Sequence, residues 1–177
     1  KTANEIEFAI SKKILLINAE SKSEILEIEK IAKYQKKIVD IGIRLNPNID
    51  AETLNQISTG KKENKFGVLE KSFINLVNYC KKSNNLNLKC LSVHIGSQIL
   101  NIKPYQKMLG VLEKIIEKTN YHFEYIDLGG GMGIDYKNSK KELDLIKYSS
   151  LIKNFQFKNN SKIIFEPGRS IVGNSGF

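Results

Sequence analysis

The stretch Tyr125-Ile126-Asp127-Leu128-Gly129-Gly130-Gly131-Met132-Gly133 places four glycines in five positions directly after a strand-like run. Without side chains the backbone can approach a ligand closely, and successive N–H groups in such a turn form a concave nest that attracts an anion. The same glycines could instead serve a turn that only requires positive φ. This stretch alone leaves both interpretations open.

Two further polar clusters follow short apolar runs in the same way. The first is Ser92-Val93-His94-Ile95-Gly96-Ser97-Gln98, and the second is Ile164-Phe165-Glu166-Pro167-Gly168-Arg169. Polar residues that follow successive strands are typical of a site at the C-terminal edge of a parallel sheet. The residues expected to cluster at that edge are Asn46, His94, Gly130 and Glu166.

The rest of the sequence alternates between strand-like and helix-like segments. Continuous apolar runs predict buried strands, and apolar residues at spacings of three and four predict helices. Ser21 or Ser23 can cap the first helix, whose apolar face covers residues 25–32. The predicted strands span residues 14–18, 38–45, 88–93, 123–128 and 163–165. The first predicted helix begins at its serine cap, and the others span 72–82, 104–118 and 140–157. A polar loop covers 48–66.

Buried strands that are each followed by a helix indicate an α/β fold with a parallel sheet. In a doubly wound sheet the polar motifs should gather at one switch point, whereas in a (β/α)8 barrel they follow many strands in turn. The motifs of this chain show the second pattern. Five strands fall short of the eight that such a barrel has in about 250 residues, so the prediction is a partial (β/α)8 TIM barrel.

Composition excludes several classes of protein. The chain has 177 residues and is 41% hydrophobic, which is ordinary for one globular domain. No apolar run approaches the roughly 18 residues of a membrane span, and a basic-then-apolar signal is missing at Lys1, so we expect no membrane partner and a cytoplasmic location. Cys80 and Cys90 form no metal-ligand spacing, which predicts two buried thiols and no metal site.

The formal charge of +9 does not predict a nucleic-acid partner. The basic residues are almost all lysines and are scattered over helix-like segments, whereas a nucleic-acid site gathers them on one stripe. Arginine occurs only at Arg44 and Arg169 among 28 basic residues. Its planar fork suits carboxylates and phosphates, so these two positions are candidates for a specific role.

Four motifs in this order resemble the diaminopimelate decarboxylase family, whose members are pyridoxal 5'-phosphate enzymes of the alanine racemase-like, fold type III group (group IV decarboxylases). The motifs are IRLNPNIDAETLNQISTGKKENKFG, SVHIGSQI, IDLGGGMGIDY and FEPGRSIVG, and the similarity spans essentially the whole chain. The ISTG…KFG loop and Gln98 favour the diaminopimelate branch. Leu54 departs from the resemblance, because a histidine is expected at that position.

The resemblance implies roles for individual residues. Glu166 corresponds to the carboxylate that faces the pyridine nitrogen of the cofactor; the alternative is a structural pair with Arg169. His94 corresponds to the imidazole that stacks on the cofactor ring; the alternative is a core histidine. Ser97 corresponds to a hydroxyl that binds the cofactor phosphate. We therefore name Glu166 and His94 as catalytic residues.

The phosphate cup implied by the resemblance is completed by Gly129, Gly130 and Gly131, and Gly168 belongs to the same cofactor-binding set. Arg169 is placed where substrate and cofactor phosphate meet. Arg44 ends a strand on the same side of the barrel, where it could bind around His94 or the ring, or could form a plain ion pair.

The resemblance also implies that residues 1–177 form one incomplete cofactor-binding barrel domain. Lys65 is not the Schiff-base lysine, which belongs in a segment before Lys1, and a C-terminal β domain belongs after Phe177. The complete protein is expected to be a homodimer that converts meso-2,6-diaminopimelate to L-lysine and carbon dioxide, whereas this fragment alone is expected to be inactive. The alternatives are a decarboxylase of ornithine or arginine, or a non-catalytic homologue with a regulatory binding role.

Overall fold

The structure is a computed structural model that describes residues 1–49, 66–136 and 142–175. The strands are β1 (Ile17–Ala19), β2 (Val39–Leu45), β3 (Leu86–Val93), β4 (Tyr125–Asp127) and β5 (Lys162–Ile164). The helices are α1 (Ala3–Ser11), α2 (Lys22–Tyr34), α3 (Glu70–Cys80), α4 (Ile102–Thr119), α5 (Leu145–Asn159) and α6 (Arg169–Val172).

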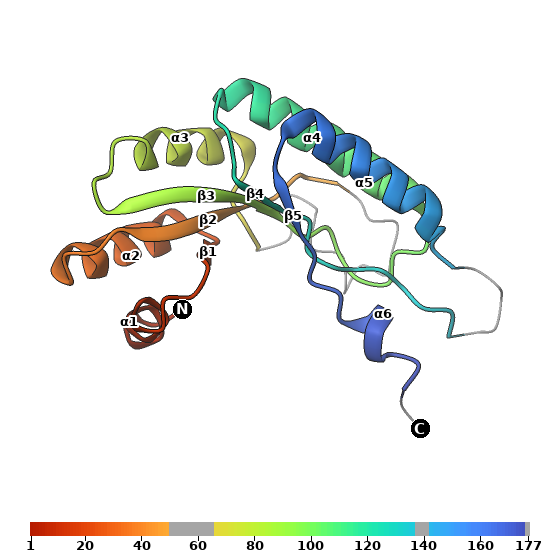
Figure 1. Cartoon of the computed structure of the whole chain (residues 1–177), viewed down its shortest axis with the longest axis horizontal. Coiled ribbons are helices and arrows are strands. Elements are labelled where there is room, and N and C mark those ends of the chain that lie inside the picture. The colour runs from red at the N-terminus through yellow and green to blue at the C-terminus, as the bar shows by residue number, and fades with distance from the viewer. Residues whose placement is uncertain (50–65, 137–141, 176–177) are drawn as a thin grey trace.

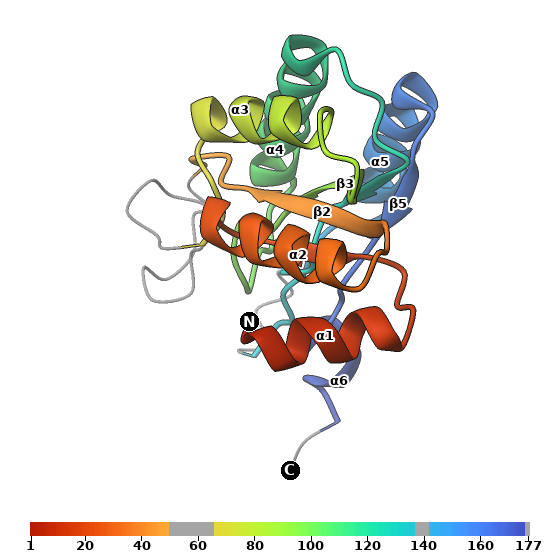
Figure 2. The same cartoon turned by 90° about the vertical axis from the view of Figure 1, so that its left-hand side faces the viewer.

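The five strands form one parallel sheet in the order β1-β2-β3-β4-β5. Each crossover therefore moves one strand in the same direction, and right-handed crossovers of this kind place their helices on a single face. Figures 1 and 2 show α2, α3, α4 and α5 following one another around the outside of the curved sheet. A doubly wound sheet would reverse direction at a switch point. The order confirms the predicted barrel-type α/β fold.

The pleat of the strands separates two sets of side chains. Ile43, Leu91 and Ile126 are hydrogen-bonded neighbours in the register of the sheet, and all three are fully buried on the face that the helices cover. The next residue along each strand points to the opposite, concave face. Those next residues are Arg44, Ser92 and Asp127, which are also aligned in register. Polar side chains therefore line the concave face at the C-terminal edge.

The helices confirm the predicted amphipathic faces. Ser21 caps α2 by accepting a hydrogen bond from the Glu24 N–H at 3.2 Å. The buried residues of α2 are Ile25, Ile28, Ile31 and Ala32, and those of α3 are Phe73, Leu76, Val77 and Cys80. Fully burying one such aliphatic or aromatic side chain stabilises the fold by about 1.5–3 kcal/mol. None of the described helices is both long and apolar enough to cross a membrane.

The N-terminal segment differs from the prediction. Residues 14–18 were expected to form a buried strand, but β1 begins only at Ile17, and Ile14 and Leu15 are 50% and 55% exposed. Helix α1 was not predicted, although Thr2 and Glu5 form a complete capping box at its start. The two deviations have one cause: α1 packs on α2 outside the sheet, and the apolar run serves partly as its connection to β1.

Both cysteines are buried, as predicted, and burial raises the pKa of each thiol to about 12. Since the thiolate is the reactive form, only about one thiol in 10⁴ is ionised at pH 8. We expect Cys80 and Cys90 to resist iodoacetamide at pH 8 in the native full-length protein and to react after denaturation. Peptide mass mapping of both samples measures this, and alkylation of the native protein at either cysteine would contradict it.

Candidate functional site

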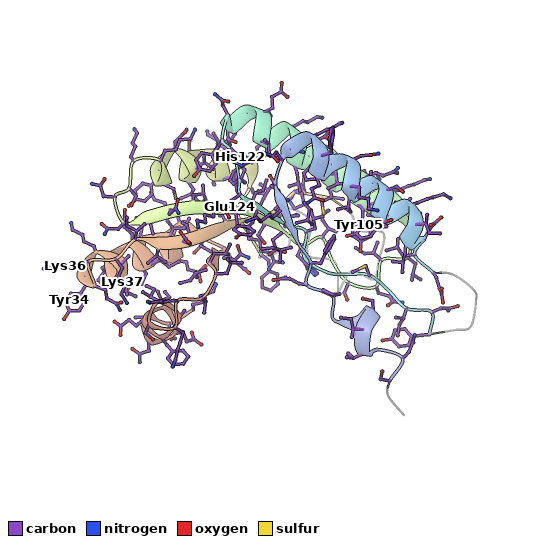
Figure 3. The ribbon with its side chains drawn as sticks, viewed as in Figure 1. Tyr34, Lys36, Lys37, Tyr105, His122 and Glu124 are labelled. Carbon is purple, nitrogen blue, oxygen red and sulfur yellow. The ribbon has the colours of Figure 1, made fainter. Side chains whose placement is uncertain are left out.

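Three loops meet at the C-terminal edge of the sheet. They follow β3, β4 and β5, at the opposite end of the strands from the labelled Tyr34, Lys36 and Lys37 in Figure 3. The Gly130 N–H donates to His94 Nδ1 at 3.2 Å, and the Glu166 N–H donates to the Gly129 carbonyl at 2.8 Å. The structure thus brings together His94, Gly130 and Glu166, and Asn46 follows β2 at the same edge.

The glycines allow these loops to touch through their backbones. A Cβ atom on Gly130 would lie 2.2 Å from the Glu166 carbonyl oxygen, and a Cβ on Gly131, which has a φ of +91°, would lie 2.2 Å from the Gly96 carbonyl oxygen. The Gly129 and Gly130 N–H groups are engaged within the site, with Asp127 and His94 respectively. Among the described residues, the Gly131 N–H donates to no other group. It is an available backbone donor of this turn.

The imidazole of His94 is held in one neutral form. Burial lowers its pKa and Arg44 lowers it further, whereas Asp127 acts in the opposite direction. Because Nδ1 accepts the Gly130 N–H, a neutral ring carries its proton on Nε2. The result is a fixed, uncharged aromatic ring at the edge of the site, and its stacking role stays a prediction.

Asp127 is a buried side chain at the candidate site that the sequence did not predict. It is 1% exposed and accepts hydrogen bonds from Asn18 Nδ2 at 3.0 Å, Ser92 Oγ at 3.0 Å and the Gly129 N–H at 2.9 Å. These partners come from β1, β3 and the glycine turn. A carboxylate between an apolar strand and a glycine run was the available signal, because a buried acid requires several donors.

Glu166 stands without a direct partner. Among the described residues its carboxylate forms no hydrogen bond and no ion pair. Glu166 is exposed in this chain, yet partial burial of its carboxylate raises its pKa, Asp127 raises it further, and Arg44 acts in the opposite direction. The alternative pair with Arg169 is not formed. Arg169 instead lies over the Tyr136 ring at 5.6 Å and donates to the Tyr136 hydroxyl at 3.3 Å.

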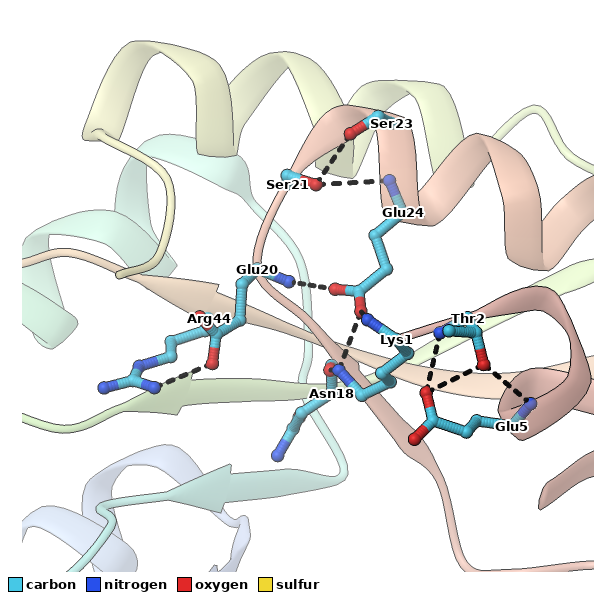
Figure 4. Close-up of polar contacts among 9 residues, drawn as sticks. All are labelled: Lys1, Thr2, Glu5, Asn18, Glu20, Ser21, Ser23, Glu24 and Arg44. Atoms are coloured by element: carbon cyan, nitrogen blue, oxygen red, sulfur yellow. Dashed lines mark hydrogen bonds and ion pairs between the residues drawn. The ribbon is translucent and has the colours of Figure 1, made fainter. Parts of the chain in front are cut away.

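Arg44 forms the plain ion pair that was one of its two predicted roles. Its Nη1 lies 2.8 Å from Glu20 Oε1, and its guanidinium lies 5.3 Å from the centre of the Phe66 ring. Figure 4 shows the pair with Glu20. Glu20 follows β1, so the pair ties the C-terminal ends of β1 and β2 together. Arg44 still acts on His94 and Glu166 through its charge, since it lowers both pKa values.

The remaining predicted residues are spread over the same loops. Ser97 is half-buried in the loop after β3. Gly168 precedes α6, and a Cβ atom placed there would meet no atom within 4 Å, so its neighbourhood in this chain is open. Leu54 and Lys65 lie outside the described residues, so the roles considered for them are not placed. The cofactor and substrate assignments of Ser97, Gly168 and Arg169 stay predictions.

Replacing Asp127 by Asn should lower the pKa values of both His94 and Glu166. The reason is that the negative charge of Asp127 raises both values, and the amide removes this charge while keeping one oxygen as an acceptor for the Gly129 N–H. NMR titration of the two side chains in the cofactor-free full-length protein measures the shifts.

The matched control removes a carboxylate from the opposite end of the sheet. Asp40 lies in β2 and pairs with Lys89 at 2.9 Å, so Asp40→Asn should leave both site pKa values in place. An unchanged His94 pKa in Asp127→Asn would show that this carboxylate does not act electrostatically on the site.

The fold and the site define a class of α/β barrel domain with a glycine turn and an unpaired acid at the C-terminal edge of its sheet. The chain belongs to the family described as pyridoxal-dependent decarboxylase, pyridoxal binding domain, whose model matches residues 1–173. Its site residues accordingly lie in a domain that binds pyridoxal phosphate.

Several known proteins are similar over nearly the whole chain. Diaminopimelate decarboxylase of Helicobacter pylori is 42% identical over 180 residues, which cover 99% of this chain and 44% of that protein. The enzyme of the same name from Aquifex aeolicus is 38% identical over 99% of this chain and 43% of that protein. The chain therefore spans less than half the length of these relatives.

Solved structures agree with the sequence comparison. The crystal structure of diaminopimelate decarboxylase from Helicobacter pylori complexed with L-lysine has a TM-score of 0.88 and 40% identity, and it covers 97% of this chain and 44% of that chain. The enzyme from M. jannaschii in co-complex with L-lysine has a TM-score of 0.85 at 30% identity over 97% of this chain and 42% of that chain. Lysine decarboxylase from Selenomonas ruminantium is 20% identical and shows the shared fold alone.

Proposed function

We propose that the full-length protein is a pyridoxal-phosphate-dependent decarboxylase that converts meso-diaminopimelate to L-lysine and carbon dioxide, and that it works as a homodimer. The similarity to diaminopimelate decarboxylases along 99% of this chain supports the reaction. The similar structures from Helicobacter pylori and M. jannaschii described above are complexes with L-lysine, which is the product of the proposed reaction. Residues 1–177 supply part of the cofactor-binding barrel domain in this proposal.

The observation that carries the proposal is the unpaired carboxylate of Glu166, whose backbone contacts the glycine turn that also binds His94. Its raised pKa marks an anion that partial burial and the negative charge of Asp127 destabilise, so a cationic partner would relieve it. A protonated pyridine nitrogen is such a partner. The group fits the chemistry of the residues that are present.

Each residue then has a distinct task. When bound, pyridoxal phosphate supplies an electron sink for the charge left on the substrate carbon after carbon dioxide leaves. Glu166 holds a proton on the ring nitrogen, and a charge-assisted hydrogen bond of this kind is worth about 1.5–3 kcal/mol. The neutral imidazole of His94 supplies a flat face for the ring. Ser97 and the Gly131 N–H provide donors for the phosphate, and Arg169 supplies a positive charge for phosphate or substrate carboxylate.

The direct test uses the purified full-length protein with pyridoxal phosphate and separate meso-diaminopimelate, L-ornithine and L-arginine substrates. We expect carbon dioxide and L-lysine in equal amounts from meso-diaminopimelate, and loss of both when the cofactor is removed. Faster release of carbon dioxide from ornithine or arginine would move the protein to another branch of the family. Retention of the cofactor without turnover of any of the three would identify a non-catalytic homologue, and size-exclusion chromatography with light scattering tests the dimer.

A further inference from the structure

The loops that follow β3 and β4 are joined by four consecutive hydrogen bonds. Two of them are made by the backbone: the Ile99 N–H donates to the Gly131 carbonyl at 2.8 Å, and the Gly133 N–H donates to the Ile99 carbonyl at 3.1 Å. The other two are made by the Gln98 side chain. Its Nε2 donates to the Ile134 carbonyl at 2.5 Å, and its Oε1 accepts from the Ile134 N–H at 3.2 Å.

The Gln98 amide thus pairs with the backbone of Ile134 as a peptide group would. Ile99 and Met132 form an isolated parallel bridge, and the side-chain amide adds a second link between the same two loops at Ile134. A primary amide can do this because it carries a donor and an acceptor on the same planar group, as a peptide does. Both groups of Ile134 would otherwise lack these partners.

The backbone at Gln98 indicates that this arrangement is imposed on the chain. Its φ is +63°, in the left-handed region that residues other than glycine avoid at a cost of about 1–2 kcal/mol. A Cβ atom on Gly133 would lie 2.9 Å from the Gln98 carbonyl carbon, so the two loops are already in close contact there. The two bonds to Ile134 offset the backbone strain only while the loops stay together.

We infer that Gln98 is a positioning residue that fixes the Ser97 loop against the glycine turn and so sets the shape of the phosphate-binding end of the site. Ser97 directly precedes Gln98, and the available Gly131 N–H lies in the other loop. A donor from each loop can meet the same phosphate only if the two loops hold one relative position. We call the two hydrogen bonds from the Gln98 amide to Ile134 the clamp. The inference rests on the proposed function for the identity of the cofactor, but not for the existence of the clamp.

The test compares Gln98→Met and Gln98→Glu with the parent in the full-length protein. Methionine keeps the length of the side chain and removes both hydrogen bonds. We expect about tenfold weaker binding of pyridoxal phosphate to the cofactor-free protein, which corresponds to about 1.4 kcal/mol, in line with the loss of two net hydrogen bonds. Hydrogen exchange of the cofactor-free protein should show faster exchange at Ile99 and Gly133 with unchanged protection in β2.

Gln98→Glu adds a signature that a general structural role would not give. An ionised carboxylate can accept from the Ile134 N–H but repels the Ile134 carbonyl, whereas a protonated carboxyl can make both bonds. The clamp favours the protonated form and so raises the pKa of the new group above its ordinary value of about 4.3; its contribution is fully present below about 4.3 and is lost only as the pH rises through the raised pKa. Relative to the parent at each pH, cofactor affinity should be about tenfold weaker at pH 8 and recover to within about threefold at pH 5.

The matched control is Gln106→Glu on the exposed surface of α4, which should follow the parent at both pH values. Parent-like affinity and exchange in Gln98→Met, or no recovery of Gln98→Glu at low pH, would overturn the inference. Loss of protection throughout β2 and β3 would overturn it as well, because it would show a general structural role. If the parent itself binds no pyridoxal phosphate, the proposed function fails. The hydrogen exchange of Ile99 and Gly133 still tests whether the clamp holds the two loops together.

Discussion

Glu166→Gln should lower the turnover of the full-length protein by at least about 100-fold, or about 2.7 kcal/mol in the barrier, at saturating cofactor. Glutamine keeps the size of the side chain but is neutral, so it cannot stabilise a protonated ring nitrogen by charge. Cofactor affinity should change far less, because the donors for the phosphate lie in other loops. Steady-state kinetics and a cofactor titration separate these two effects.

The control for this substitution is Glu113→Gln on α4. Glu113 pairs with Lys158 at 3.3 Å on the exposed outer surface, so its replacement should leave turnover and cofactor affinity unchanged. If Glu166→Gln turned over normally with bound cofactor, Glu166 would not be the acid that faces the ring nitrogen. The proposed use of its unpaired carboxylate would then be wrong.

Gly130→Ala should weaken cofactor binding by about 10- to 100-fold and should also lower turnover. The added Cβ atom would lie 2.2 Å from the oxygen and 3.1 Å from the carbon of the Glu166 carbonyl, and both belong to the backbone. Overpacking of this kind costs about 1–3 kcal/mol, since the loops must separate to relieve it. The glycine turn and Glu166 shift together, so the substitution affects both the phosphate donors and the acid.

Gly110→Ala provides the matched control, because a Cβ atom on Gly110 would meet no atom within 4 Å. Gly110 lies inside α4, where alanine is favoured over glycine by about 1 kcal/mol, so the variant should be slightly more stable and equally active. Gly130→Ala with parent-like affinity and turnover would show that the loops can yield at this point. Crystal structures of the two variants would show whether Glu166 moves.

The barrel-type sheet and most of its elements could be predicted because their patterns are local. Apolar spacing fixed the buried faces of α2 and α3, and Ser21 marked the start of α2. The apolar run at Ile14 was misread because a continuous run shows that residues prefer burial but not which of them reach the sheet. Only the packing of α1 on α2 places Ile14 outside the sheet and Ile17 within it.

The site was predictable as a set of residues but not as a network. His94, Gly130 and Glu166 follow strands of a parallel sheet, and the topology alone brings them to one edge. The role of Asp127 depends on donors that are distant in the sequence, including Asn18, which is separated from it by 109 positions. The free carboxylate of Glu166 could not be foreseen either, because Arg169 is close in sequence and only its contact with Tyr136 shows that it turns elsewhere.

The pleat of the strands has a further consequence for how the protein can change. Val93 is buried in the core and His94 lies in the site, and Leu128 and Gly129 follow the same order. Deleting one residue within a strand would exchange these neighbours, so that the core would receive the polar side chain and the site the apolar one. Insertions and deletions among homologues should therefore be confined to the connections that precede the strands. Within the strands we expect substitutions only.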